Sequence, residues 1–337
     1  MDPLTNKERV LAAIHFNKPE YTPHFVDFTT QMYDKMVAHT GNPQYCQTVN
    51  NHVTMCILNA PQEEIKPGYF RDEFGVVWNK TGADKDIGVI DEILLEETED
   101  LENFVFPQVD EAFVREQMQA LQDSDPNNFR IAAIGFTLFE RAWSLRGMEN
   151  LLCDMILEPE FVEALFDQIT EYNLKIMDIA LEYDFDCFHF GDDWGQQKGL
   201  IMGPKTWRTF IKPRMEKLYA KAKAAGKYLS QHSCGDLREV LDDLHEIGLN
   251  IYQTFQPEIY GYDYAEKLYG KITIWGGLST QRALPMKTPD EIREILADMM
   301  AHFPDGGLIA APTHSVPGDV PPENIEAMVD VFMHQKA

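Results

Sequence analysis

The residues with the clearest capacity for chemistry are His232 and Cys234, which stand two positions apart at the end of the apolar run 228–231. Side chains alternate in direction along an extended strand, so these two project to the same side. Imidazole nitrogen and thiolate sulfur are ligands that zinc prefers in proteins. Gly235 then lets the chain turn towards the next element. The spacing predicts part of a zinc site, although a free cysteine beside a hydrogen-bonded histidine is also an ordinary core pairing.

The elements that must position this pair are indicated by the periodicity of the chain. From about residue 129 onwards, apolar runs typical of strands alternate with amphipathic helical stretches, as in parallel sheets with crossover helices. Strands are expected at residues 24–28, 129–136, 186–192, 228–234, 250–256, 271–278 and 308–314, with a hairpin insertion around 74–78. Helical spacing is clear over 161–179 and 237–247. Units of this size predict an α/β protein, a single (β/α)8 TIM barrel over residues 1–337 with an N-terminal insertion.

Composition limits the class of protein further. The chain has 337 residues, of which 44% are hydrophobic, enough for one large core. A formal net charge of -26 disfavours nucleic acid and anionic membranes as partners. No apolar run approaches the roughly 18 residues of a membrane span. The five cysteines are odd in number and widely spaced, and the N-terminus is polar, so we expect a cytoplasmic protein without a signal peptide.

Polar residues follow most of the expected strands, at the end of the barrel where active sites lie. The polar residues at or just beyond the ends of the expected strands include His232, Cys234 and His314. The residues expected to act in catalysis are Asp192, Asp193 and Gln196. The residues expected to contact the substrate are Asp27, Glu140, Trp194, Gln256 and Gln281. One polar residue at the end of a strand can arise by chance. The repetition of this placement over several strands predicts a single polar site.

Several of these residues also have a structural interpretation. Asp192 and Asp193 can cap a helix, because an aspartate oxygen satisfies free backbone amides at a helix start. Trp194 is of a type more often found in a core than in a substrate wall. His314 can be an ordinary loop residue, and His189 is interpreted as a hydrogen-bonded histidine of the barrel.

Several segments together carry a resemblance to a known family. They are residues 6–10 (NKERV), 191–197 (GDDWGQQ), 232–236 (HSCGD), 275–279 (WGGLS) with Gln281, 311–314 (APTH) and 320–325 (VPPENI). In combination they resemble the uroporphyrinogen decarboxylase superfamily, and within it the corrinoid-dependent methyltransferase branch. The resemblance spans essentially the whole chain, implies a single (β/α)8 domain and is compatible with a homodimer.

Two branches of that superfamily imply different activities. The decarboxylases hold the acidic arms of a tetrapyrrole with an Arg-Gln-Ala-Gly-Arg motif after the first strand. Here that place is taken by residues 27–31 (DFTTQ), which include no arginine, so porphyrinogen decarboxylation is disfavoured. The methyltransferases carry zinc on His-x-Cys and a later cysteine and act with a corrinoid protein. This chain keeps His232 and Cys234, and His314 stands where the later cysteine is expected.

One thiolate and two neutral imidazoles leave a zinc ion more positive than two thiolates do, which suits an oxygen leaving group. We therefore expect a zinc-dependent methyltransferase that demethylates a small methylated substrate, an aromatic methyl ether, and passes the methyl group to a corrinoid (cobalamin) protein. The fourth ligand is open between Gln256, Glu258, Asp193 and a water or substrate atom. Gln231 or Asp236 is expected to orient the histidines. The alternatives are a decarboxylase-type lyase and a metal-free binding subunit.

Overall fold

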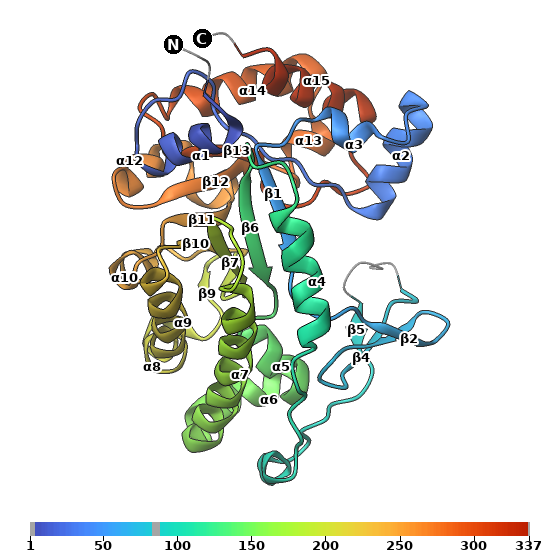
Figure 1. Cartoon of the computed structure of the whole chain (residues 1–337), viewed down its shortest axis with the longest axis vertical. Helices are drawn as coiled ribbons and strands as arrows, with labels where there is room; N and C mark the ends of the chain where they lie inside the picture. Colours follow the sequence, from blue (N-terminus) through green and yellow to red (C-terminus); the bar gives the residue numbers. More distant parts are fainter. Residues whose placement is uncertain (1–3, 83–87, 336–337) are drawn as a thin grey trace.

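The computed structural model describes residues 4–82 and 88–335. Its centre is a curled parallel sheet of seven strands in the order β1-β6-β7-β10-β11-β12-β13 (Figure 1). The strands are β1 (Val53–Ile57), β6 (Phe129–Ile134), β7 (Cys187–Gly191), β10 (Tyr228–His232), β11 (Ile251–Phe255), β12 (Thr273–Leu278) and β13 (Leu308–Pro312). Every residue of β6, β12 and β13 is buried, as expected of parallel strands that are covered on both faces.

The eighth place of the barrel is taken by an extended segment, residues 24–28, that forms isolated bridges instead of a regular strand. His24 bridges to Ala310 of β13, and Phe28 bridges to Val316. On the other side, the amide of His52 donates to the carbonyl of His24 (3.1 Å). The segment therefore lies between β13 and β1 and closes the sheet into a barrel.

Helices surround the barrel on its outer face (Figure 1). The longer ones are α1 (Asn6–Ile14), α2 (Thr30–Thr40), α4 (Glu111–Gln122), α5 (Phe139–Arg146), α6 (Met148–Leu157), α7 (Pro159–Ala180), α8 (Gly203–Phe210), α9 (Lys212–Ala224), α14 (Pro289–Ala301) and α15 (Pro322–Met333). The shorter ones are α3 (Tyr45–Thr48), α10 (Leu241–Ile247), α11 (Pro257–Tyr260), α12 (Ala265–Leu268), α13 (Ala283–Met286), η1 (Thr98–Glu102) and η2 (Tyr262–Tyr264). In the part of the chain that the structure describes, no helix combines the length and apolar character needed to cross a membrane.

The hydrophobic core is divided by the barrel wall. A small cluster fills the interior and includes Phe129, Ile131, Trp275 and Ile309. Helix α1 contributes to this cluster and contacts β1, β6 and β13. A much larger cluster packs between the outer face of the strands and the helices. The wall is thus held from both sides by apolar burial, at roughly 25 cal/mol per Å² of apolar surface.

The insertion lies beside the barrel as a four-stranded antiparallel sheet of β2 (Glu63–Lys66), β3 (Tyr69–Arg71), β4 (Val77–Asn79) and β5 (Val89–Ile90). A buried ion pair fastens it to α5, because Arg141 lies 2.6 Å from Asp72 and 3.3 Å from Glu73. Asp72 also accepts a hydrogen bond from the indole nitrogen of Trp78 (3.0 Å). The predicted hairpin at 74–78 is therefore part of a larger sheet than the sequence indicated. A further short hairpin, β8 (Gly195–Gln196) and β9 (Gly199–Leu200), follows β7.

The predicted fold class is confirmed, with two differences in the strands. The six predicted strands from residue 129 onwards all form, within the expected ranges. The expected first strand at 24–28 pairs only through bridges, and the regular strand on that side is β1, which the sequence did not indicate. β1 has only five residues and follows a polar turn, so its apolar pattern is too short to stand out.

Candidate metal centre

Three side chains converge at the C-terminal mouth of the barrel. His232 is the last residue of β10, Cys234 follows two positions later, and His314 stands two positions beyond the end of β13. One ligand atom from each lies within 4.8 Å of the others. The Nε2 atom of His232 is 3.9 Å from the sulfur of Cys234, and the two imidazole rings are 5.6 Å apart. The structure thus brings together the three residues that the sequence predicted as metal ligands.

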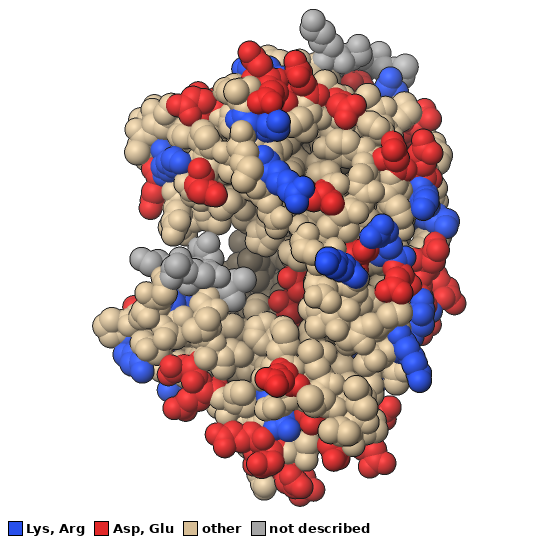
Figure 2. Space-filling view, turned by 180° about the vertical axis from the view of Figure 1, so that it is seen from behind, with Lys and Arg blue, Asp and Glu red and all other residues tan. Residues whose placement is uncertain are grey.

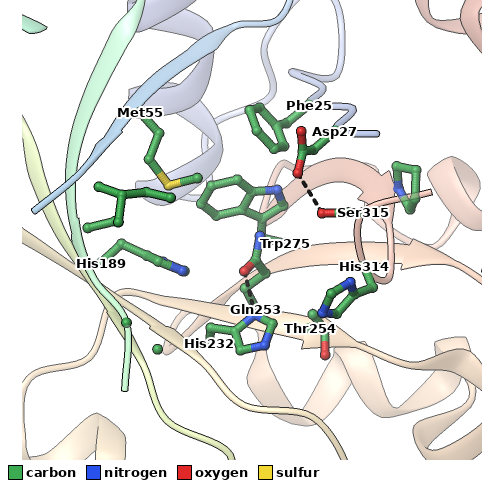
Figure 3. A pocket seen from close by; sticks show the side chains of 15 residues that line it. Phe25, Asp27, Met55, His189, His232, Gln253, Thr254, Trp275, His314 and Ser315 are labelled. Carbon is green, nitrogen blue, oxygen red and sulfur yellow. Dashed lines mark hydrogen bonds between the residues drawn. The ribbon is translucent and has the colours of Figure 1, made fainter. Parts of the chain in front are cut away.

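The imidazole of His232 is fixed by a residue on the neighbouring strand. Gln253 of β11 is paired in register with His232, and its amide oxygen lies 2.8 Å from Nδ1 (Figure 3). Because that oxygen is an acceptor, Nδ1 carries the proton and Nε2 keeps its lone pair free for a metal. The predicted orienting residues do other work. Gln231 accepts from Tyr219 (2.7 Å), and Asp236 pairs with Arg238.

Asp193 is the carboxylate that stands next to the three ligands. It accepts a hydrogen bond from the amide of Cys234 (2.7 Å) and lies 3.5 Å from Nε2 of His232. The other candidates for a fourth ligand are engaged elsewhere. Gln256 accepts from the amide of Gly235 (2.9 Å), and Glu258 accepts from the Ser279 hydroxyl. Asp193 is therefore the best placed of the three.

The electrostatics of the site favour protonated acids. Burial, reinforced by the charge of Asp193, raises the pKa of the Cys234 thiol to about 12. Burial also raises the pKa of Glu140, as do the neighbouring carboxylates of Asp193 and Asp192. Without a cation, this cluster therefore holds Cys234 as a thiol, and a bound cation would favour the thiolate.

Two of the three candidate ligands, His232 and His314, border a cavity of about 220 Å³ (Figure 3). One side is apolar, with Phe25, Met55 and Trp275 among its residues, and the other carries the polar groups of the ligand cluster. The residues that line the cavity are Phe25, Asp27, Met55, Ile57, Ala133, Gly135, His189, Gly191, His232, Gln253, Thr254, Trp275, Pro312, His314 and Ser315. Asp27 is the one predicted substrate-contacting residue among them.

Asp192 does not lie in the cavity, which corrects its predicted catalytic role. The side chain is fully buried. Its carboxylate accepts hydrogen bonds from the amides of Phe139 (2.9 Å) and Glu140 (2.8 Å) and from the indole nitrogen of Trp194 (2.5 Å). These amides belong to the first turn of α5, which has no partner of its own for them. Asp192 therefore acts as a capping residue, supplied by a different loop.

The remaining predicted residues also lie away from the cavity. Trp194 is fully buried and packs edge-on against Trp207, with ring centroids 5.5 Å apart. Gln196 is exposed on the β8–β9 hairpin, and Gln281 is exposed beyond β12. Because these loops turn outward after their strands, a polar residue there reaches solvent or a neighbouring loop instead of the mouth of the barrel.

Sequence reasoning missed several residues that do line the cavity. His189 lies on β7 among buried residues, with Nδ1 2.8 Å from the Ser230 hydroxyl, and burial lowers its pKa to about 3. The sequence interpretation as a hydrogen-bonded barrel histidine is confirmed, and its ring also borders the cavity. Gln253 was detectable in principle, because a polar residue within an apolar strand and next in register to His232 must face a polar neighbour.

Fold and site together define a (β/α)8-barrel protein with a candidate metal centre at the C-terminal end of its strands. The model of the uroporphyrinogen decarboxylase (URO-D) family matches residues 83–334, and the chain belongs to that family. Among curated proteins, none matches the chain significantly.

Two solved structures resemble the chain to different degrees. A methyltransferase from Methanosarcina mazei superposes with a TM-score of 0.72 at 16% sequence identity and covers 98% of this chain and 98% of its own. At that identity the likeness establishes a shared fold over the full length. A D-psicose 3-epimerase, solved in the presence of D-fructose, has a TM-score of 0.37 at 12% identity over 70% of this chain and 83% of its own. That second likeness is too weak to indicate a shared fold.

Proposed function

We propose that this protein is a zinc-dependent methyltransferase that takes the methyl group of an aromatic methyl ether and delivers it to a corrinoid held by a partner protein. The observation that carries the proposal is the convergence of His232, Cys234 and His314 beside a largely apolar cavity. The methyltransferase name of the structural neighbour supports the reaction class.

The three side chains fit a zinc ion. Two ligands of a tetrahedral zinc ion lie about 3.5 Å apart when the bonds are about 2.0 to 2.3 Å long. The observed separation of 3.9 Å between His232 and Cys234 needs only a small rotation to reach that value. One sulfur and two nitrogen ligands are a zinc donor set, and a fourth position stays open to Asp193, water or substrate. Zinc bound there would act as a Lewis acid on the ether oxygen as it becomes a phenolate.

The chain's own residues supply position and exclusion of water. Gln253 holds His232 in the tautomer that a metal requires, and Asp193 holds the loop of Cys234 by its amide. Phe25, Met55 and Trp275 form an apolar wall against which an aromatic ring can pack. A corrinoid on the partner would supply, as cobalt(I), the electron pair that takes the methyl carbon, and the electrons of the broken C–O bond would stay on the ether oxygen, which would take up a proton on release.

The decarboxylase alternative is less well supported. A tetrapyrrole substrate of that branch carries several carboxylate arms, which need cationic partners. Among the described residues that line the cavity, there is neither lysine nor arginine. The cavity of about 220 Å³ is also small for a tetrapyrrole.

The test is the metal content of the purified protein, measured by mass spectrometry. We expect about one zinc per chain and none in the double variant Cys234→Ala, His314→Ala. Cys153→Ala is the matched control, because Cys153 is exposed and remote from the cavity. Methyl transfer from 2-methoxyphenol to cobalt(I) cobalamin, followed by absorbance, should require the zinc-loaded form. Absence of zinc after reconstitution, or equal zinc in the double variant, would refute the metal centre.

A further inference from the structure

Asp27 is the only charged side chain, besides the histidine ligands in their protonated form, on the wall of the cavity that the structure describes. It lies on the extended segment that closes the barrel, and it is exposed towards the cavity (Figure 3). Its Oδ2 atom accepts a hydrogen bond from the Ser315 hydroxyl (2.5 Å). Ser315 directly follows the ligand His314. The carboxylate is therefore tied to the metal centre through a single neighbouring residue.

Asp27 also borders a second cavity on its other side. This cavity has a volume of about 400 Å³, and its wall includes Phe25, Tyr33, Cys46 and Asn51. Like the first cavity, its described wall holds neither lysine nor arginine. Phe25 and Asp27 thus stand between two adjoining spaces, and a substrate that extends from one to the other must pass this carboxylate.

The second oxygen of Asp27 is available to a ligand. No described residue donates a hydrogen bond to Oδ1, whereas Oδ2 is engaged by Ser315. A carboxylate oxygen is an acceptor only, so its natural partner is a hydroxyl or another N–H or O–H donor. A second carboxylate at this place would bring two like charges together without a cation between them. The net charge of -26 and the acidic side chains spread over the face in Figure 2 act in the same direction.

We propose that Asp27 determines the substrate class, so that the site accepts uncharged aromatic methyl ethers with a ring hydroxyl and rejects those with a carboxylate. This inference rests on the proposed function for the identity of the ring and goes beyond it in naming the charge and the donor group. In this arrangement the ring hydroxyl donates to Asp27, the ring packs against Phe25 and Trp275, and the methoxy group is left to face the metal ligands.

The experiment compares four small ligands in binding to the zinc-reconstituted protein by calorimetry. They are 2-methoxyphenol, methoxybenzene, 2-methoxybenzoate and 2-methoxybenzamide, so that the carboxylate or amide stands where the ring hydroxyl would meet Asp27. The benzamide matches the benzoate in size and differs in charge, and methoxybenzene lacks the hydroxyl. We expect the benzamide to bind at least tenfold more tightly than the benzoate, and 2-methoxyphenol several-fold more tightly than methoxybenzene.

Asp27→Asn should reduce both differences to less than about threefold, without changing the zinc content. Asp34→Asn is the matched control, because it removes the same charge from an exposed position of α2 outside both cavities, and both differences should persist. Equal binding of benzoate and benzamide by the native protein would overturn the inference. So would differences that survive in Asp27→Asn, or a failure of all four ligands to bind.

The same ligands separate this inference from the function on which it rests. If the uncharged ethers bind preferentially but none loses its methyl group to cobalt(I) cobalamin, the methyl-transfer proposal fails and the charge selection stands. If the benzoate is demethylated as well as the benzamide, methyl transfer stands and the charge selection fails.

Discussion

The loops after β7 and β10 both carry polar side chains at the same end of the barrel and place them in different ways. After β10, His232 and Cys234 remain partly accessible, and His232 borders the cavity while Cys234 lies beside it. After β7, Asp192 turns away from it and is sealed in the core against the start of α5, while its neighbour Asp193 faces the ligands. Adjacent residues in extended chain point to opposite sides. At this end of the barrel, the position of a residue within the loop decides between structure and chemistry more strongly than its type does.

The largest effect that would test this contrast is on stability. Asp192→Asn should lower the free energy of unfolding by about 3 kcal/mol, because buried amides of α5 lose a charged acceptor. Asp193→Asn should cost only about 1 kcal/mol, since its carboxylate is partly exposed. Chemical denaturation of the metal-free proteins measures both values. Equal losses in the two variants would contradict the division between a capping and a site-facing aspartate.

A second expected effect is on zinc affinity, through the residue that fixes the imidazole of His232. Gln253→Ala removes the acceptor that fixes His232, and outer partners of this kind are typically worth about 10- to 100-fold in metal affinity. Competition with a zinc chelator measures the change. The unfolding free energy of the metal-free protein should fall much less than in Asp192→Asn. Unchanged zinc affinity would show that another residue orients the imidazole.

A third comparison concerns a pair of histidines on the opposite wall. His24 and His52 pack with ring centroids 4.4 Å apart, and burial lowers the pKa of His52 to about 3 and also lowers that of His24. In the unfolded chain these groups bind protons below about pH 6.5, whereas in the folded chain they do not. The free energy of unfolding is therefore at its full value above that pH, and it decreases as the pH falls towards 3.

Between pH 7.5 and pH 5.0, His52 alone should account for a loss of about 2 kcal/mol in unfolding free energy. Denaturation at the two pH values, with a chelator present, should show a smaller pH dependence in His52→Gln than in the native chain. His302→Gln is the control, because His302 is only partly buried at the surface. The prediction fails if both variants retain the native pH dependence.

The smallest expected effect distinguishes a core role of Trp194 from the predicted contact with the substrate. Trp194→Phe deletes the hydrogen bond to Asp192 while keeping an aromatic ring in the core, and should cost about 1 kcal/mol of unfolding free energy. Zinc content and ligand binding should stay unchanged, because Trp194 does not border the cavity. A loss of ligand affinity without a loss of stability would instead support the predicted contact between Trp194 and the substrate.

The sequence predicted the barrel from short-range periodicity and the pair of His232 and Cys234 from its spacing, and the family resemblance added His314. His232 and Cys234 share one side of one segment, and His314 ends another strand of the same expected barrel. What it did not predict depends on long-range geometry. The hydrogen bond from Gln253 needs the register of β10 and β11, and the capping role of Asp192 needs the approach of α5.

The second cavity and the ion pair of Arg141 with Asp72 are two further features that the sequence did not predict. Each depends on how distant segments approach, such as the insertion on α5, and no local pattern of residues encodes that approach.

The segment that carries Phe25 and Asp27 is joined to its neighbours by isolated bridges, whereas His232 and Gln253 are paired in register on neighbouring strands. Asp27 is exposed and Phe25 only partly buried, so an exchange of either side chain disturbs less packing than an exchange on a fully buried strand would. The barrel therefore separates a wall whose side chains can change from the strands that carry the candidate metal ligands. A different ligand preference can be reached by altering one short stretch near the N-terminus, while the strands that carry the candidate ligands keep their geometry.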